Sequence, residues 1–311
     1  MDNYINKIIE GNCIEIMKNF DDEVIDLTVT SPPYDDLRNY KGFIFPFEDI
    51  AKELYRITKQ GGIVVWVVND ATIDGSETGT SFKQALYFKE IGFNLHDTMI
   101  FRKTNPIPQI YRKRYNNEFE FMFVFSKGAV KTHNPLLVNC LHAGLELNGT
   151  TYKNFSKNEQ TREKMAKPVK DKKIKGNIWE YVVGKKQEDQ EAKNHPAPFP
   201  CGLVRDHIKS WTNQGDVVLD PMCGSGTTAK VACEMGRKYI GIDISSEYCE
   251  IARQRIKIVE NTPMLFAMDD EPKEDYFEIA ENKIMENKNN LFNQKLSETT
   301  VLQENFAVNY Y

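Results

Sequence analysis

A short run with two prolines, at residues 30–34, has the clearest chemical meaning in this sequence. The apolar run Val24 to Thr30 predicts a buried strand, and Ser31-Pro32-Pro33-Tyr34 follows at its end. Consecutive prolines stop both helix and strand, so the chain must turn there. The Ser31 oxygen and the Pro32 carbonyl, which the diproline aims rigidly, can accept both hydrogens of an aromatic amino group. Such bonds localise the nitrogen lone pair and make the nitrogen a better nucleophile.

The exocyclic amino groups of cytosine and adenine are nitrogens of this kind. Tyr34 offers a ring on which a base extruded from a duplex can stack. Alignment of the nitrogen with an electrophile would supply the rest of the catalysis, without a covalent intermediate. The alternative interpretation is an ordinary strand-to-loop turn with a buried tyrosine. A nucleoside-binding crevice elsewhere in the chain favours the catalytic interpretation of Ser31, Pro32, Pro33 and Tyr34.

That crevice is predicted around a glycine turn, DPMCGSGTT, at residues 220–228. The strand Val217 to Asp220 ends in a carboxylate, the glycines let a ligand approach the backbone, and Thr227 can begin a helix. The next predicted strand ends at Asp243, 23 residues after Asp220, where an acid can accept hydrogen bonds from two ribose hydroxyls. Both carboxylates are therefore expected to face one crevice.

The charge of this crevice indicates which cofactor it takes. A carboxylate beside the first turn attracts a sulfonium and an ammonium, whereas it would repel a pyrophosphate. The turn also lacks a full GxGxxG pattern and the lysine of a phosphate-binding loop. These features favour S-adenosylmethionine over NAD.

Alternating strands and helices surround both motifs and predict a doubly wound α/β sheet. The predicted strands are 24–30, 63–68, 97–101, 119–125, 217–220 and 239–242, and the predicted helices are 47–58, 82–91, 203–211, 227–235 and 245–260. The alternation fails between about 130 and 193, where the chain is polar and lysine-rich apart from a short run at 178–183. We therefore expect one α/β domain with an insertion, followed by an acidic and polar tail from about residue 263.

Charge is unevenly distributed along the 311 residues, whose net charge is −5. Residues 102–114 hold five basic and no acidic side chains, and residues 162–175 carry a net charge of +5. Solvated faces often carry such runs, but polarised charge also suits a protein with one phosphate-facing side. The candidate DNA-binding residues are Arg102, Lys103, Arg112, Lys113, Arg114, Lys170, Lys172, Lys173 and Lys175.

Other features limit the remaining classes of protein. The sequence has no apolar stretch long enough for a membrane span and no secretory signal, so the cytoplasm is the expected compartment. Its six cysteines form no CxxC pair, which argues against a disulfide framework. Cys140 and His142 have no second ligand pair at suitable spacing, so no metal is expected.

Taken together, the motifs resemble those of DNA amino-methyltransferases, in the permuted β-group that places the catalytic motif before the cofactor motif. The resemblance covers roughly residues 8–260 and includes NHPAPFP at 194–200 and FSKG at 125–128. It implies a mostly parallel, seven-stranded Rossmann-like methyltransferase fold. It also implies catalytic and cofactor-binding halves at 1–130 and 194–262, a target-recognition insertion at 131–193 and a tail at 263–311.

The resemblance also implies a set of cofactor contacts. These are Asn12, Cys13, Phe199, Asp220, Pro221, Met222, Cys223, Gly224, Gly226, Thr227 and Asp243. The sequence departs from the family at Asn12, where the usual aspartate holds the adenine amino group of the cofactor. The carbonyl of Asn12 can still accept that hydrogen bond.

Relatives with serine before Pro-Pro more often methylate cytosine N4, whereas an acid or asparagine there usually accompanies adenine N6. Ser31 therefore favours cytosine and leaves adenine as the alternative. Expected partners are double-stranded DNA and a cognate restriction endonuclease, and the enzyme is a monomer or homodimer.

Three other classes of protein are alternatives. A cytosine-C5 methyltransferase would use a cysteine nucleophile, but Cys201 precedes the cofactor turn instead of following it. An RNA or protein-glutamine methyltransferase shares the Pro-Pro-Tyr core. A non-catalytic DNA-binding protein would leave the Ser31 run and the crevice unexplained.

Overall fold

The computed structural model describes residues 1–33, 45–106, 108, 113–141, 143–144, 169–184 and 199–261. The predictions for Tyr34, Arg112, residues 194–198 and the tail from 263 fall outside these ranges. The described residues belong to one compact unit that spans Met1–Thr262. The predicted domain boundaries remain predictions.

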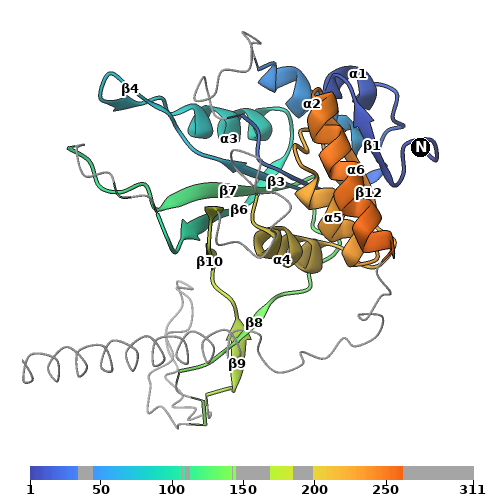
Figure 1. The fold of residues 1–311 in the computed structure, drawn as a ribbon. Helices are drawn as coiled ribbons and strands as arrows, with labels where there is room; N and C mark the ends of the chain where they lie inside the picture. Colours follow the sequence, from blue (N-terminus) through green and yellow to red (C-terminus); the bar gives the residue numbers. More distant parts are fainter. Residues whose placement is uncertain are drawn as a thin grey trace, which may run out of the picture. The chain divides into compact units, whose positions relative to one another are not determined.

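A large twisted sheet forms the centre of this unit (Figure 1). Within the described ranges it has eight strands, in the spatial order β1 (Lys7–Glu10), β12 (Lys238–Asp243), β11 (Val217–Asp220), β2 (Ile25–Thr30), β3 (Thr58–Val68), β7 (Phe119–Ser126), β6 (Asn94–Lys103) and β10 (Ile178–Tyr181). Neighbouring strands are parallel except where β7 pairs with β3 and β6. The predicted mostly parallel α/β sheet is confirmed.

The predicted number of strands, seven, is wrong because the insertion contributes β10. This strand pairs in parallel with the edge strand β6, with Ile178 opposite Ile100 and Trp179 opposite Phe101. Pairing with β10 gives the backbone groups on the open edge of β6 hydrogen-bond partners. It also buries Trp179, a large apolar side chain. The insertion is therefore partly built into the sheet.

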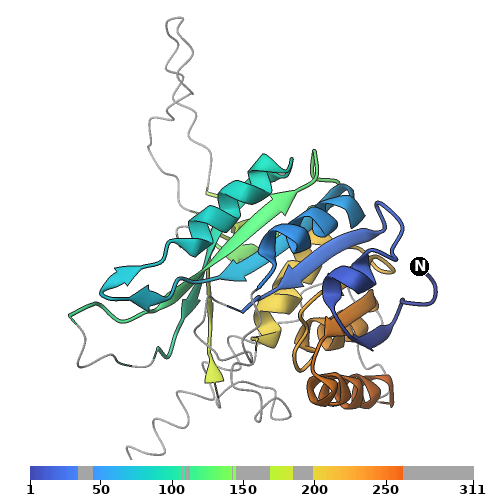
Figure 2. The same ribbon diagram turned by 90° about the horizontal axis from the view of Figure 1, so that it is seen from above.

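Helices cover both faces of the sheet, as Figure 2 shows from above. The helices are α1 (Cys13–Met17), α2 (Phe47–Ile57) and α3 (Thr80–Glu90) on one face, and α4 (Cys201–Trp211), α5 (Thr227–Glu234) and α6 (Ser246–Asn261) on the other. Strand β3 has both of its faces buried. Ile63, Val65 and Val67 belong to the core that α4 covers, whereas the residues between them belong to the core covered by α2 and α3. The continuous apolar run at 63–68 thus reflects burial on both faces.

The short elements were harder to predict. Three predicted helices, 47–58, 227–235 and 245–260, agree with the structure to within one residue at each end, whereas the helices predicted at 82–91 and 203–211 begin two residues earlier. Four of the six predicted strands also agree to within one residue. The strands predicted at 63–68 and 97–101 are longer in the structure, where β3 begins at Thr58 and β6 spans Asn94–Lys103. The sequence did not reveal β1, α1, the small hairpin of β4 (Thr72–Ile73) and β5 (Ser76–Glu77), or the pair β8 (Leu137–Asn139) and β9 (Lys172–Ile174). Figure 1 shows β8 and β9 away from the large sheet, with the chain returning to it through β10.

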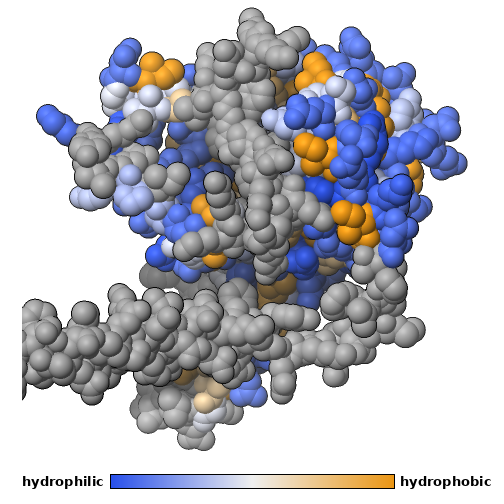
Figure 3. Space-filling model, in the orientation of Figure 1, coloured by the Kyte–Doolittle hydropathy of each residue, from blue (hydrophilic) through white to orange (hydrophobic). Residues whose placement is uncertain are grey.

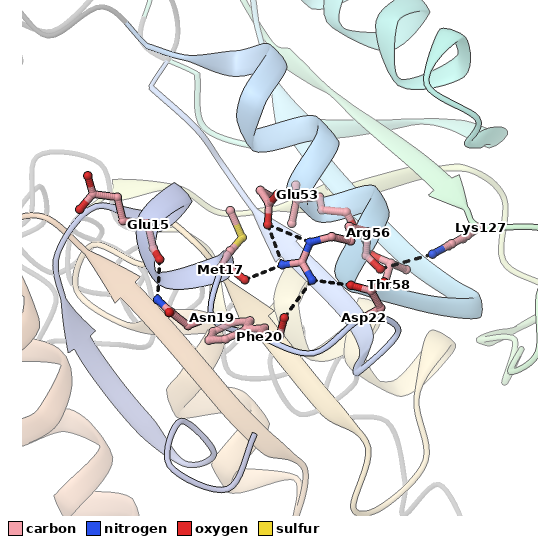
Figure 4. A network of polar contacts seen from close by, with 10 residues as sticks. Glu15, Met17, Asn19, Phe20, Asp22, Glu53, Arg56, Thr58 and Lys127 are labelled. Carbon is pink, nitrogen blue, oxygen red and sulfur yellow. Dashed lines mark hydrogen bonds and ion pairs between the residues drawn. The ribbon is translucent and has the colours of Figure 1, made fainter.

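Arg56, at the end of α2, anchors the turn that leads into β2 (Figure 4). Its guanidinium donates to the carboxylates of Glu53, at 2.7 Å, and Asp22, at 2.6 Å. It also donates to the carbonyls of Met17, at 2.7 Å, and Phe20, at 2.9 Å. These bonds fix the start of the strand that ends at the diproline.

The FSKG motif lies close to this anchor. The ammonium of Lys127 forms an ion pair with Glu23 at 3.2 Å and lies over the ring of Tyr55 at 4.8 Å. Lys127 of this motif therefore stabilises the turn at Glu23, directly before the first residues of β2.

In the view of Figure 3 most of the described surface is hydrophilic, and hydrophobic side chains lie on it in separate spots. Among the described residues, no helix combines the length and the apolar character needed to cross a membrane.

Candidate active site

The two sequence motifs meet at the carboxyl ends of β2 and β11, which are neighbouring parallel strands. Thr28 lies opposite Leu219, so the ends of the two strands coincide. The hydroxyl of Thr30 donates to the Asp220 carboxylate at 2.8 Å, in a buried position. Parallel strands present their carboxyl ends at one edge, where α/β folds bind ligands. The run at 30–33 and the glycine turn thus share one site.

Asp220 is a buried carboxylate at the centre of this site, with 5% of its surface exposed. Burial raises its pKa to about 6, and the negative charge of Asp243 adds to the effect. Hydrogen bonds from Thr30, Thr228 and the backbone N–H of Met222 act in the opposite direction. The site therefore holds negative charge that a cationic ligand would stabilise.

The glycine turn is shaped by close packing against α6. Gly226 has φ +78°, and a Cβ added there would lie 2.5 Å from the Cβ of Ala252. Its N–H donates to the Cys223 carbonyl at 2.8 Å, and α5 begins at the next residue, Thr227. Only glycine fits this position without displacing a helix.

Asp243, at the end of β12, is bonded to the same turn. One carboxylate oxygen accepts the N–H of Gly224 at 2.8 Å, and the other accepts the N–H of Ser245 at 2.9 Å. Each oxygen keeps a second lone pair that can accept a ribose hydroxyl. The negative charge of Asp220 suits the sulfonium and ammonium of S-adenosylmethionine, and the oxygens of Asp243 suit its ribose hydroxyls. The glycines of the turn leave the backbone between the two carboxylates accessible to the cofactor.

The predicted residues on β1 and α1 lie on the other side of Asp243. The N–H of Gly11 donates to the Asp243 carbonyl at 2.9 Å, which places Asn12 beside the site. The side-chain oxygen of Asn12 caps α1 by accepting the N–H of Ile14 at 2.9 Å and that of Glu15 at 3.5 Å, so a bond from this oxygen to a cofactor would replace the longer of the two. Burial raises the pKa of the Cys13 thiol to about 11, so this thiol stays protonated.

The remaining predicted site residues lie in or near the turn. Ser31 and Pro33 are half-buried and Pro32 is buried, at the end of β2. Pro221, Cys223 and Thr227 are buried, Met222 is half-buried, and Phe199 packs against the core that α4 covers. Burial raises the pKa of the Cys223 thiol well above its usual value, which leaves it no role as a nucleophile.

Arg255 on α6 is a part of the site that the sequence did not reveal. It is 2% exposed, and its guanidinium donates to the Ser225 carbonyl, to the Ser225 hydroxyl at 3.0 Å and to the Thr227 hydroxyl at 3.3 Å. A signal was present, because Arg255 lies three residues after Ala252, on the buried stripe of the helix.

The predicted DNA-binding residues divide into two groups. Four form ion pairs within the protein: Arg102 with Glu180 at 2.7 Å, Lys103 with Glu120 at 2.7 Å, Arg114 with Glu77 at 3.3 Å, and Lys175 with Asp206 at 3.2 Å. Lys113, Lys170, Lys172 and Lys173 are exposed. Lys172 and Lys173 belong to β9, so this described part of the second basic run faces solvent.

Comparison with known proteins identifies the family. The sequence profile of the N6/N4 DNA methylase family matches residues 25–254. The chain is 52% identical over 244 residues to the orphan methyltransferase M.BamHII of Bacillus amyloliquefaciens, covering 77% of this chain and 91% of that protein. It is 28% identical over 272 residues to the DNA adenine methyltransferase YhdJ of Escherichia coli, covering 83% and 85% of the two chains.

Solved structures agree on the fold. The PvuII cytosine-N4-specific DNA methyltransferase superimposes with a TM-score of 0.61 at 20% identity, over 85% of this chain and 87% of that one. A DNA modification methylase of Thermus thermophilus in complex with S-adenosylmethionine has a TM-score of 0.55 at 20% identity, over 85% and 99%. The family also removes the cytosine-C5 alternative, and Cys201 is a half-buried residue at the start of α4. The chain belongs to the DNA methylase family of N4 and N6 amino-methyltransferases, and S-adenosylmethionine is its cofactor.

Proposed function

We propose that this chain methylates the N4 amino group of cytosine in duplex DNA. The observation that carries the proposal is the serine at position 31, at the end of β2 and next to the Thr30–Asp220 hydrogen bond. A hydroxyl is a weaker acceptor than a carboxylate, so Ser31 suits an amino nitrogen that needs less activation, which we propose for the cytosine N4 group. Serine before Pro-Pro is also more frequent in relatives that methylate cytosine.

In the proposed reaction the chain orients the base and localises the lone pair of its nitrogen. The Ser31 hydroxyl oxygen and the Pro32 carbonyl accept the two amino hydrogens, and Tyr34 stacks on the extruded base. S-adenosylmethionine, when bound, supplies an electrophilic methyl group. The N–CH3 bond forms as the S–CH3 bond breaks, and the nitrogen then loses one proton to solvent. Asp220 and Asp243 hold the cofactor, with the backbone of the glycine turn between them.

Target recognition is assigned to the insertion, about residues 131–193. Its described part places Lys170, Lys172 and Lys173 at the surface, on or beside β9. Exposed lysines gain most from binding phosphates because they give up no internal ion pair. These three side chains are therefore the strongest candidates for binding the DNA backbone.

The experiment that tests the base is product analysis. DNA methylated by the purified protein is digested to nucleosides, which are identified by mass spectrometry. N4-methylcytosine is the expected product. N6-methyladenine without N4-methylcytosine would refute the assignment and leave the family unchanged. Adenine is the second candidate because YhdJ, at 28% identity, is named an adenine methyltransferase.

A partner nuclease is a separate question. The 52% identical relative is described as an orphan methyltransferase, which favours an enzyme that acts without a cognate restriction endonuclease. A restriction assay on extracts of the source cells, with unmethylated plasmid as substrate, tests this. Cleavage of that plasmid but not of the methylated one would reveal a partner.

A further inference from the structure

We propose that Thr30 and Thr228 are positioning residues, which join the catalytic end of β2 to the cofactor strand and helix and so keep the amino nitrogen aligned with the methyl donor. The inference rests on amino-methylation at this site and holds for either base. Neither side chain is placed in contact with the base or the cofactor. Both act through Asp220 and the β2 backbone.

The joint consists of two hydroxyl groups from opposite sides of the site. Thr30 Oγ1 donates to Asp220 Oδ1 at 2.8 Å, which connects β2 to β11. Thr228 Oγ1 donates to the carbonyl of Val29 at 3.2 Å, which connects α5 to β2. The Thr228 hydroxyl also lies within hydrogen-bonding reach of Asp220, so its single hydrogen is shared between this carboxylate and the Val29 carbonyl. The three elements therefore meet in one buried cluster, and both threonines are 0% exposed.

The place of this cluster in the chain explains why it would matter for the reaction. Thr30 is the residue directly before Ser31, and Thr228 is the second residue of the helix that follows the glycine turn. The hydroxyls thus connect the part of the chain that holds the nitrogen to the part that holds the methyl donor. A misplacement of about 1 Å between reacting groups can slow a reaction by ~10²-fold.

Strand β2 itself offers a matched control. Thr28 lies two residues before Thr30, on the same face of the strand, and is also 0% exposed. Its hydroxyl has no hydrogen-bond partner among the residues that the structure describes. Replacing Thr28 by valine therefore changes the same atoms at the same depth without breaking a bond.

The experiment compares Thr30→Val, Thr228→Val and Thr28→Val in the full-length protein, using radiolabelled cofactor and duplex DNA. We expect the first two to lower kcat by ~10- to 100-fold, and Thr28→Val to leave it unchanged. Thr30→Ser keeps the hydroxyl and should restore most of the rate. Equal losses in Thr30→Val and Thr28→Val would indicate general packing and overturn the proposal, as would a wild-type kcat in Thr30→Val.

A second readout does not depend on turnover. The Thr30 bond lowers the pKa of Asp220, so Thr30→Val should move the pH dependence of cofactor binding, measured by calorimetry, to higher pH. Thr28→Val should bind with the wild-type profile, and an unmoved profile in Thr30→Val would overturn the role. If the wild-type product is N6-methyladenine, the base assignment fails while the comparison of the variants still decides this inference.

Discussion

The guanidinium of Arg255 lies 3.0 Å from the hydroxyl of Ser225, so helix α6 holds the glycine turn through a buried cation. The same guanidinium donates to the Ser225 carbonyl and to Thr227. A turn that must present its backbone to a ligand has few side chains of its own to hold it. Arg255 supplies that support from outside the motif.

Arg255→Met should therefore destabilise the protein and weaken cofactor binding. The substitution leaves buried acceptors in the turn without their donor, at a cost of about 1–3 kcal/mol of unfolding free energy. Denaturant titration and calorimetry measure the two effects. Lys257→Met, at an exposed position of the same helix, is the control and should change neither quantity. A wild-type cofactor affinity in Arg255→Met would show that the turn holds its shape unaided.

Asp243→Ala should weaken cofactor binding by about 1.5–3 kcal/mol, the range for a hydrogen bond to a charged group. The structure adds a second cause, because the substitution also removes the acceptor for the N–H groups of Gly224 and Ser245. Asp243→Asn keeps one oxygen and should lose less affinity. Glu247→Gln, an exposed acid in the first turn of α6, serves as the control in calorimetry. An unchanged affinity in Asp243→Ala would remove this residue from the site.

Gly226→Ala should destabilise the fold by about 1–3 kcal/mol through overpacking, in addition to the cost of its left-handed backbone. The added Cβ would lie 2.5 Å from the Cβ of Ala252. Gly215→Ala separates the two costs, because Gly215 has φ +82° and nothing within 4 Å of an added Cβ. Denaturant titration of both variants should show the larger loss at Gly226. Equal losses of unfolding free energy in the two variants would mean that α6 shifts to accommodate the added methyl group.

Replacing Lys170, Lys172 and Lys173 by glutamine should weaken DNA binding and flatten its salt dependence, by up to ~0.9 in slope for each phosphate that is no longer neutralised. Lys175→Gln should behave differently, because Lys175 pairs with Asp206 at 3.2 Å and lies over the ring of Trp179 at 4.8 Å. Its replacement should lower stability more than it changes the salt slope. DNA-binding titrations over a range of salt concentrations measure this slope. An unaltered slope in the triple variant would show that the lysines of and beside β9 do not contact DNA phosphates.

The pKa of Asp220 gives a stability prediction with a definite sign. Burial raises this pKa from 3.8 to about 6 in the folded, cofactor-free protein. Between these values the folded state holds a proton that the unfolded state has lost, so this group's contribution to stability falls as pH rises from about 4 to 6. Asp220→Asn removes the titration. Unfolding free energies measured across that pH range should diverge between the two proteins, and parallel curves would contradict the raised pKa.

Local patterns were enough to predict the elements that carry the chemistry. The apolar runs at 63–68 and 217–220 are short and flanked by glycine or proline, which favours strands of a sheet covered on both faces over buried helices. The diproline and the glycine turn lie at strand ends, as their backbone requirements demand. The alternation of strands and helices was likewise sufficient for the parallel α/β sheet.

Features that depend on the pairing of distant segments were decided only by the tertiary structure. The sequence placed Arg102, Lys103 and Lys175 on a DNA-facing side. In the structure strand pairing brings Arg102 to Glu180 and Lys103 to Glu120, and the packing of α4 brings Lys175 to Asp206. The eighth strand, β10, is short and follows a polar stretch, so only the open edge of β6 reveals its role.

The site itself shows the same division. Residue types and spacing were enough to predict that Ser31, Asp220 and Asp243 lie at one edge of the sheet, because strand ends and turns are local properties of the chain. The hydrogen bond between Thr30 and Asp220 joins residues 190 positions apart, and the buried Arg255 reaches its turn from 30 residues away. Such bonds follow from which strands and helices become neighbours, and that depends on packing the whole core rather than on any stretch of sequence.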